Sequence, residues 1–264
     1  MLDTLSILIH AHSKVGKSTL AGTAPPPMVI FDAEGSTKFL PMRKVRWDPL
    51  REGPPQYDGT WEAAVVNVHS FDVLDQGYKW LMTGQHQFRS LIFDSITEGQ
   101  RKLKTKLVGP NKMERSDWDE LLRNMDAVVR GFRDLTQHPI NPITVAVFVA
   151  ETRLGDQGKY RPYMQGQIAT SLPYFMDLVG YLWVEPVVDG AGNQLTDERG
   201  KPAKLRRLLI APDHPLYEAG ERVQGLLPDV IDSPNLTQML LTVYPHLAAT
   251  NGQQPVPDVG WPTA

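Results

Sequence analysis

The chain has 264 residues, of which 41% are hydrophobic and 22% charged, and its formal net charge at pH 7 is −3. This composition excludes a collagen-like or largely disordered chain, and the absence of cysteine excludes disulfides, thiolate zinc sites and a cysteine nucleophile. The weak net charge leaves the partner undecided, because local basic patches can still bind phosphates. No apolar run approaches the roughly 20 residues that span a bilayer, and the first residues lack a signal-peptide pattern. We therefore expect a cytoplasmic protein with no membrane partner.

The first half of the sequence alternates short apolar runs with segments of helical character. The apolar runs are continuous rather than alternating, which indicates strands buried on both faces. Leu5 to His10 is the first such run, and a glycine turn separates it from a helix over Lys17 to Gly22. In chain order we then expect a strand at 28–31, a loop around a short strand at 41–59, a short strand at 67–69, a helix at 71–83 and a strand at 90–93.

The second half continues this alternation and then changes character. Helices are expected at 96–107 and 117–137, and the most apolar strand at 143–150. The polar, glycine-containing segment 154–167 is predicted to be a mobile loop, and 179–188 with 205–211 an antiparallel hairpin. Strands that alternate with helices imply a mainly parallel sheet flanked by helices. We expect one α/β domain over residues 1–247 and a flexible C-terminal tail over 248–264, which is rich in Pro and Gly.

The strongest motif is AHSKVGKST, which fits the phosphate-loop pattern G-x-x-x-x-G-K-[ST] except that Ala11 replaces the first glycine. A strand precedes it and a helix follows, so backbone N–H groups can converge on a polyphosphate. Lys17 would neutralise the β and γ phosphates, and the Ser18 hydroxyl would bind Mg²⁺. The alternative is a chance G-K-S-T at an ordinary helix start. The predicted nucleotide-binding residues are Ala11, His12, Ser13, Lys14, Val15, Gly16, Lys17, Ser18 and Thr19.

Two strand ends offer the carboxylates that a phosphate-loop enzyme needs. Asp94 follows an apolar run and is expected beside Ser18, where it would bind Mg²⁺ directly or through water. Its alternative role is an ordinary helix N-cap. Glu34 ends the other run and could polarise the water that attacks the γ phosphate, or could simply be a solvated turn carboxylate.

The segments HSKVGKSTLA, VIFDAEGS and LIFDSITEG together resemble the RecA-like ATPases, especially the phage and bacterial proteins grouped with Sak-type single-strand annealing proteins. The resemblance extends over about residues 5–245 and also reaches AAA-type nucleotide-binding phage proteins. It implies a RecA-like P-loop NTPase core that uses ATP and Mg²⁺. It further implies that Glu34 is the catalytic base and that Asp94 is the Walker B aspartate.

The same resemblance assigns roles further along the chain. It places a γ-phosphate sensor at 151–153, although this sequence lacks the glutamine that a RecA-type recombinase has near this point. It places a DNA-binding loop at 154–167, where cations and aromatic rings could bind single strands, and an arginine finger at Arg222, while Gly220 stands where a lysine is often found. The candidates are Glu151, Thr152, Arg153 and Arg222 for the sensor or finger, and Lys159, Tyr160, Arg161 and Tyr163 for DNA.

The functional hypothesis from these residues is a Mg²⁺-dependent ATPase that acts on single-stranded DNA in phage recombination or annealing. Its implied partners are single-stranded DNA, a single-strand binding protein and further copies of the chain, in the host cytoplasm. ATP is favoured over GTP by the resemblance, and no guanine-reading N-K-x-D motif is present. Two alternatives remain open: a P-loop kinase for nucleotides or small molecules, and a scaffold that binds nucleotide without hydrolysing it.

Overall fold

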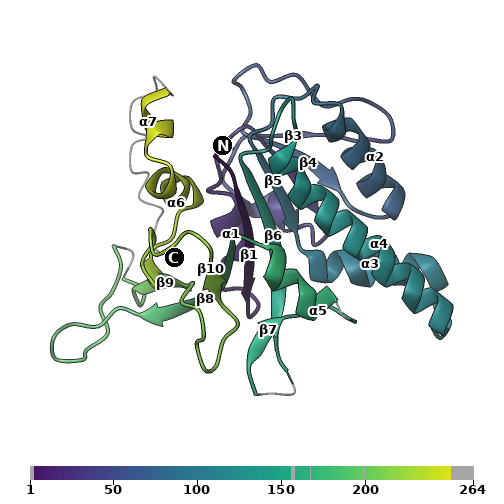
Figure 1. Cartoon of the computed structure of the whole chain (residues 1–264). Coiled ribbons are helices and arrows are strands. Elements are labelled where there is room, and N and C mark those ends of the chain that lie inside the picture. Colours follow the sequence, from purple (N-terminus) through teal and green to yellow (C-terminus); the bar gives the residue numbers. More distant parts are fainter. Residues whose placement is uncertain (1–2, 156–157, 167, 199, 251–264) are drawn as a thin grey trace.

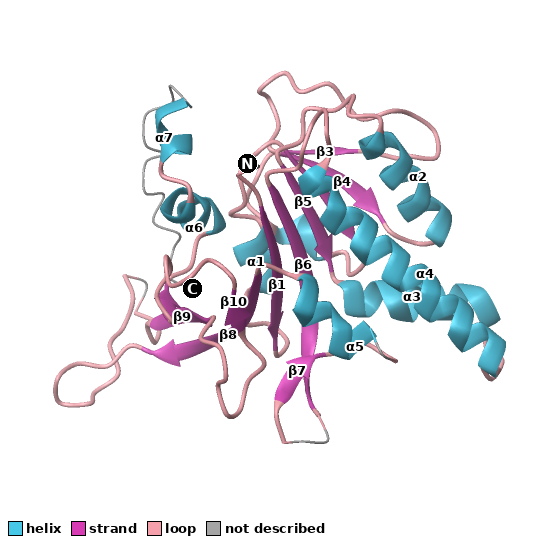
Figure 2. Cartoon of the chain, viewed as in Figure 1, coloured by secondary structure: helices cyan, strands magenta, loops and turns pink. Residues whose placement is uncertain are grey.

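The described part of the chain folds around one mixed β-sheet with helices on both faces (Figures 1 and 2). The structure is a computed structural model and describes residues 3–155, 158–166, 168–198 and 200–250. Within these residues the sheet has 11 strands, in the order β11-β9-β8-β1-β6-β5-β2-β4-β3, with β10 paired to β8 and β7 paired to β6. The central strands are parallel, whereas β8 and β9 form an antiparallel pair. The predicted α/β fold with its C-terminal hairpin is thereby confirmed.

The strands of the sheet are short, and most of them follow the apolar runs of the sequence. Their bounds are β1 Leu5–Ala11, β2 Met28–Asp32, β3 Lys44–Arg46, β4 Ala63–Asn67, β5 Ser90–Asp94, β6 Val145–Leu154, β7 Tyr160–Pro162, β8 Leu178–Pro186, β9 Lys204–Leu209, β10 Gly220–Glu221 and β11 Val230–Asp232.

The helices connect these strands and supply the two outer layers. The α-helices are α1 Lys17–Ala21, α2 Phe71–Met82, α3 Ile96–Val108, α4 Arg115–Asp134, α5 Ile168–Ser171, α6 Leu236–Val243 and α7 His246–Thr250; the 3₁₀ turns are η1 Ser36–Phe39, η2 Leu135–Gln137 and η3 Leu172–Phe175. In the part of the chain that the structure describes, no helix has both the length and the apolar character of a membrane-spanning segment.

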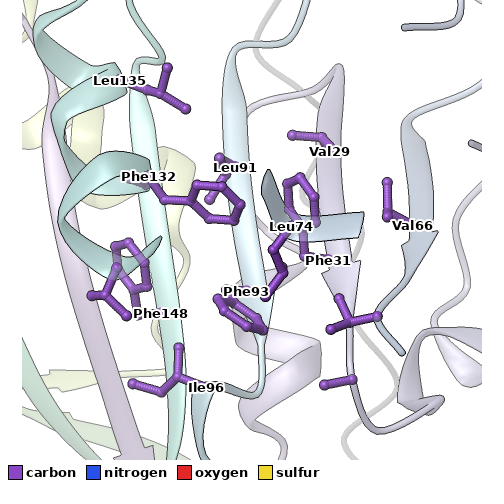
Figure 3. Packing of buried hydrophobic residues seen from close by; sticks show 14 of the residues in the cluster. Val29, Phe31, Val66, Leu74, Leu91, Phe93, Ile96, Phe132, Leu135 and Phe148 are labelled. Carbon is purple, nitrogen blue, oxygen red and sulfur yellow. The ribbon is translucent and has the colours of Figure 1, made fainter. Parts of the chain in front are cut away.

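One face of the sheet packs against α2, α3 and α4 through a large aromatic core. Every residue of β2 and β5 is buried, because these strands lie between two helical layers. Phe132 of α4 contacts Phe31 of β2 with ring centroids 4.6 Å apart and Phe93 of β5 with centroids 6.0 Å apart. Figure 3 shows Phe132 among these strand residues and Phe148 of β6. The apolar spacing of α4 therefore aims one stripe of that helix at the sheet.

The opposite face packs against α1 and α6. Leu20 of α1 and Leu240 of α6 share a buried core with Ile7 of β1 and Leu208 of β9. Leu236 N and the Thr237 hydroxyl bind Thr23 just after α1, which joins the start of α6 to the end of α1. The two cores hold β1, and hence the loop that follows it, between two packed layers.

Two predicted boundaries are wrong. The short strand expected at 67–69 lies at Ala63–Asn67, where it pairs with β2 and β3. The prediction missed its start because the two alanines there have low β-propensity. The segment expected to be a loop at 154–167 contains β7, which pairs with the last three residues of β6. With only three residues, Tyr-Arg-Pro, β7 has no apolar run that a pattern search could detect. Of the predicted tail, residues 248–250 belong to α7, and 251–264 lie outside the described residues.

Replacing Phe132 with alanine should lower the free energy of unfolding by about 3–5 kcal/mol, because the cavity would open between three aromatic residues in the core. The matched control is Phe39→Ala, whose side chain is 80% exposed and should change stability by about 0.5 kcal/mol or less. Urea unfolding measures both changes. Equal effects of the two substitutions would contradict the packing described here.

Candidate active site

The predicted phosphate loop joins the end of β1 to the start of α1. Ala11 is the last buried residue of β1 and has strand conformation, so alanine at this position avoids the steric cost that a left-handed residue would carry. The left-handed positions lie later, at Lys14 with φ 62° and Gly16 with φ 101°. A Cβ atom on Gly16 would also lie 2.5 Å from Nε of Arg206. The backbone conformation of Gly16 thus requires glycine, and a side chain there would also displace Arg206.

Lys17 is the cation at the centre of the site. Its Nζ atom donates hydrogen bonds to the carbonyl oxygens of Ala11, at 3.4 Å, and of His12, at 3.1 Å. Burial lowers the pKa of Lys17, and the carboxylates of Glu34, Asp94 and Glu151 oppose that shift. The chain therefore brings three acidic strand ends around the lysine of the loop.

A chain of hydroxyl groups links the loop to Asp94. The Ser18 hydroxyl contacts the Ser36 hydroxyl at 3.2 Å, and Ser36 donates to Oδ2 of Asp94 at 2.8 Å. The other oxygen of this buried carboxylate, Oδ1, has no hydrogen-bond partner among the described residues. Hydroxyl and carboxylate oxygens are the ligands that Mg²⁺ prefers, so the Ser18 and Asp94 side chains fit a magnesium ion or its water shell.

The ionisation of Asp94 reflects its surroundings. Burial raises its pKa to about 6, the hydroxyls of Ser18 and Ser36 lower it, and the charges of Glu34 and Asp32 raise it further. The side chain that caps α3 is Ser95, which accepts a hydrogen bond from Glu98 N at 3.2 Å. Asp94 is thereby left to face the loop.

Glu34 lies in a tight turn that Asp32 organises. The Asp32 carboxylate accepts hydrogen bonds from the backbone N–H groups of Glu34 at 3.1 Å and Gly35 at 2.7 Å, and from the backbone and hydroxyl of Thr37. Ser95 donates to Oε1 of Glu34 at 2.5 Å. Asp32, Ser36 and Ser95 were not predicted as site residues, although the D-x-E-G-S-T pattern carries the signature of an aspartate that caps its own turn.

The three predicted sensor residues lie side by side at the end of β6. Arg101 of α3 holds Glu151 with two hydrogen bonds, at 2.8 and 2.6 Å, and lowers the pKa of that carboxyl. The Thr152 hydroxyl contacts Nδ1 of His10 at 3.1 Å, and burial lowers the pKa of His10 to about 4. Glu151 is one of the carboxylates that act on Lys17, whereas Arg153 is exposed.

Two of the predicted DNA-binding residues, on β7, contact the segment before β10. The Tyr160 ring stacks on Tyr217 with centroids 5.7 Å apart, and Arg161 pairs with Glu218 at 3.3 Å. The Tyr160 ring also meets the edge of His12, a residue of the phosphate loop, at 5.5 Å. This contact connects β7 directly to the loop.

The other two DNA-binding candidates flank the same hairpin. Tyr163 follows β7, and its ring lies 4.9 Å from the guanidinium of Arg153 and 5.7 Å from that of Arg101. Lys159 precedes β7, and its carbonyl accepts a hydrogen bond from Gly155 N at 2.9 Å. The four candidates therefore share one hairpin, which extends from the sheet at the end that carries the phosphate loop (Figure 1).

Arg222 lies at the opposite edge of the sheet. Its backbone N–H bonds to the carbonyl of Asp177, whose carboxylate accepts from Ser6 at the start of β1, and its side chain donates to the Tyr174 carbonyl. Ser6 and Ala11 are separated by most of β1, which is on the order of 15 Å. Arg222 and Asp177 line a cavity of about 520 Å³ there. Within one chain, Arg222 does not join Lys17.

Comparison with known proteins agrees with this geometry. The family model described as AAA domain matches residues 3–223, which include every residue of the candidate site described above. The chain belongs to the AAA domain family. Membership of this family of P-loop ATPases indicates nucleotide binding and hydrolysis. In such ATPases the nucleotide is usually bound together with Mg²⁺.

Apart from the family model, this AAA domain has low similarity to known proteins in the other two comparisons. A search of curated proteins finds no match. One similar solved structure is a prototypical ATPase from the type III secretion system of pathogenic bacteria, with 14% identity and a TM-score of 0.42. The similarity covers 68% of this chain and 52% of the other, so the chain spans about half the length of that ATPase.

Asp94→Asn should stabilise the AAA domain in metal-free buffer by about 1–3 kcal/mol at pH 7.5, because it removes a buried charge. The folded pKa of about 6 lies above the unfolded value of about 4, so the folded protein binds more protons between these pH values. Stability is therefore lost as pH rises through this window, and the advantage of the asparagine should shrink toward pH 4.

Urea unfolding in the presence of a chelator, at pH 7.5 and pH 4.5, measures this difference. Asp119→Asn, an exposed change on α4, is the matched control and should have little effect. An asparagine variant no more stable than wild type at pH 7.5 would contradict the described burial of the Asp94 charge.

Proposed function

We propose that this AAA domain is a Mg²⁺-dependent ATPase that acts on single-stranded DNA during phage recombination or single-strand annealing. The observation that carries the proposal is the convergence of Lys17, Ser18, Glu34 and Asp94 at one edge of the sheet. A lysine, a hydroxyl and two carboxylates beside a glycine loop are the groups that phosphoryl transfer to water requires.

Each of these residues has a distinct task in hydrolysis. Lys17 would leave the two loop carbonyls that it now binds and neutralise the β and γ phosphates. Ser18 and Asp94 would hold the metal, which supplies positive charge to the phosphate oxygens. Glu34 would accept a hydrogen bond from the attacking water and orient it, while Ser95 and the Asp32 turn fix its position. No covalent intermediate is needed. The closeness of Glu34 to Lys17 supports hydrolysis over a purely structural nucleotide site.

The proposed DNA contact is the β6–β7 hairpin. Arg153 is exposed and lies over the Tyr163 ring, a pairing of cation and aromatic face that suits phosphates and bases of a single strand. The contact between Tyr160 and His12 offers a physical connection from this hairpin to the phosphate loop. The position of Arg222, far from its own loop, is compatible with action on a neighbouring copy, which supports a homo-oligomer. A single-strand binding protein is the further proposed partner.

Lys17→Ala should reduce ATP hydrolysis on the order of 100-fold, because the phosphates lose their buried cation. The assay is phosphate release with and without single-stranded DNA, at low and moderate salt, since phosphate contacts depend on salt. We expect DNA to stimulate the wild type but not the variant, and Lys79→Ala on α2 to behave as wild type. Lys17-dependent hydrolysis that is indifferent to DNA at both salt concentrations would reject the DNA part of the proposal.

Glu34→Gln should lower kcat by about 100-fold or more while nucleotide affinity stays close to that of wild type, because the amide keeps the shape but no longer accepts the water proton. Single-turnover hydrolysis and equilibrium binding of ATP separate the two effects. Glu52→Gln, which changes an exposed residue in the loop after β3, is the control. Unchanged kcat in the Glu34 variant would assign the water-orienting role to another group.

A further inference from the structure

A second cation approaches the phosphate loop from the C-terminal hairpin. Arg206 lies on β9, and its Nε atom donates a hydrogen bond to the Val15 carbonyl at 3.1 Å. Its guanidinium occupies the space beside Gly16, where a Cβ atom would lie 2.5 Å from Nε and 3.2 Å from Nη2. Leu208, two residues later on the same strand face, is buried in the core that contains Leu20 of α1. β9 is therefore packed so that Arg206 reaches the loop.

Arg206 differs from Arg207, the next residue of β9, in having no carboxylate within the described part of the chain to neutralise its charge. Arg207, on the other face of β9, pairs with Glu185 at 3.0 Å and with Asp232 at 2.9 Å. Arg206 makes no ion pair within the described residues, and its hydrogen bond to the Val15 carbonyl uses Nε, so the Nη groups keep donors for an anion. A half-buried guanidinium without a carboxylate, placed against a loop whose ligand is an anion, is suited to binding that anion.

The order of strands says which part of the nucleotide Arg206 faces. Asp94 on β5 and Glu34 after β2 lie on one side of β1, and they mark the reacting γ-phosphate end. Arg206 lies on the opposite side of β1, two strands away on β9. The two ends of a phosphate chain held by the loop should face these two sides.

We propose that Arg206 is a nucleotide-binding residue supplied by the same chain, and that its guanidinium binds the phosphates nearest the nucleoside, which ATP and ADP share. This inference rests on the proposed nucleotide site and adds a residue to it. Arg206 then contributes equally to ground state and transition state, so it sets affinity rather than the rate of the chemical step.

The test compares Arg206→Ala, Arg206→Gln and Arg206→Lys with wild type and with Arg207→Ala. We measure the dissociation constants of Mg-ADP and of a non-hydrolysable ATP analogue by calorimetry, and kcat for ATP. Arg206→Ala should weaken both ligands by about tenfold or more and leave kcat nearly unchanged. Lysine should restore part of the affinity. Glutamine, which keeps an N–H donor but no charge, should bind as weakly as alanine and show a shallower salt dependence than wild type.

Several results would overturn the inference. Unchanged affinity in Arg206→Ala is the first. Full affinity in Arg206→Gln would mean that the residue only tethers the Val15 carbonyl. A fall in kcat without weaker binding would place Arg206 at the γ phosphate. An equal loss of affinity in Arg207→Ala would also overturn the inference, because the effect would not be specific to Arg206. Thermal melting without nucleotide shows that each variant is folded, and the lysine variant keeps the test valid if alanine is not. A wild type that binds no nucleotide would reject the proposed function as well, whereas Lys17-dependent binding unaffected at Arg206 would reject this inference alone.

Discussion

The parallel pairing of β1, β6, β5 and β2 is the constraint on which the site depends. In this register Asp32 lies opposite Asp94, and Ala11 lies opposite Glu151. Because the strands run in the same direction and are buried on both faces, their apolar residues end at one level and their polar residues begin at one edge. Four segments far apart in the sequence thus deliver a loop and several carboxylates to the same place. The packing of the core and the assembly of the site are consequences of one arrangement.

Buried and half-buried ionisable groups of both signs meet at that edge. The pKa of Asp94 is raised by burial and by two neighbouring carboxylates, while burial lowers the pKa of Lys17. Each shift reflects a preference for the uncharged form, so the burial of the ionised Asp94 and Lys17 side chains works against folding. A nucleotide with its metal brings charges of both signs that these groups can bind. Binding of a nucleotide and its metal would therefore favour the ionised forms of these residues.

Much of the fold followed from local pattern, and less of the site did. Continuous apolar runs identify β1, β2, β5 and β6 because burial on both faces leaves no polar position in them. The strand at Ala63–Asn67 was misplaced because alanine signals burial without signalling a strand. Ser36 joins Ser18 to Asp94 through a turn whose shape depends on Asp32, so its role appears only in three dimensions. Arg206 is 191 residues from its hydrogen-bond partner in the loop, a separation that no motif spans.

β6 is unusual in serving two parts of the molecule with one backbone. Its first residues lie in the buried centre of the sheet, and its last three pair with β7, which lies off the main order of strands. Glu151 and Thr152 stand at the transition, where one acts on Lys17 and the other touches the buried ring of His10. Because β6 is one continuous strand from the buried core to the hairpin, a displacement of the hairpin would also move Glu151 and Thr152.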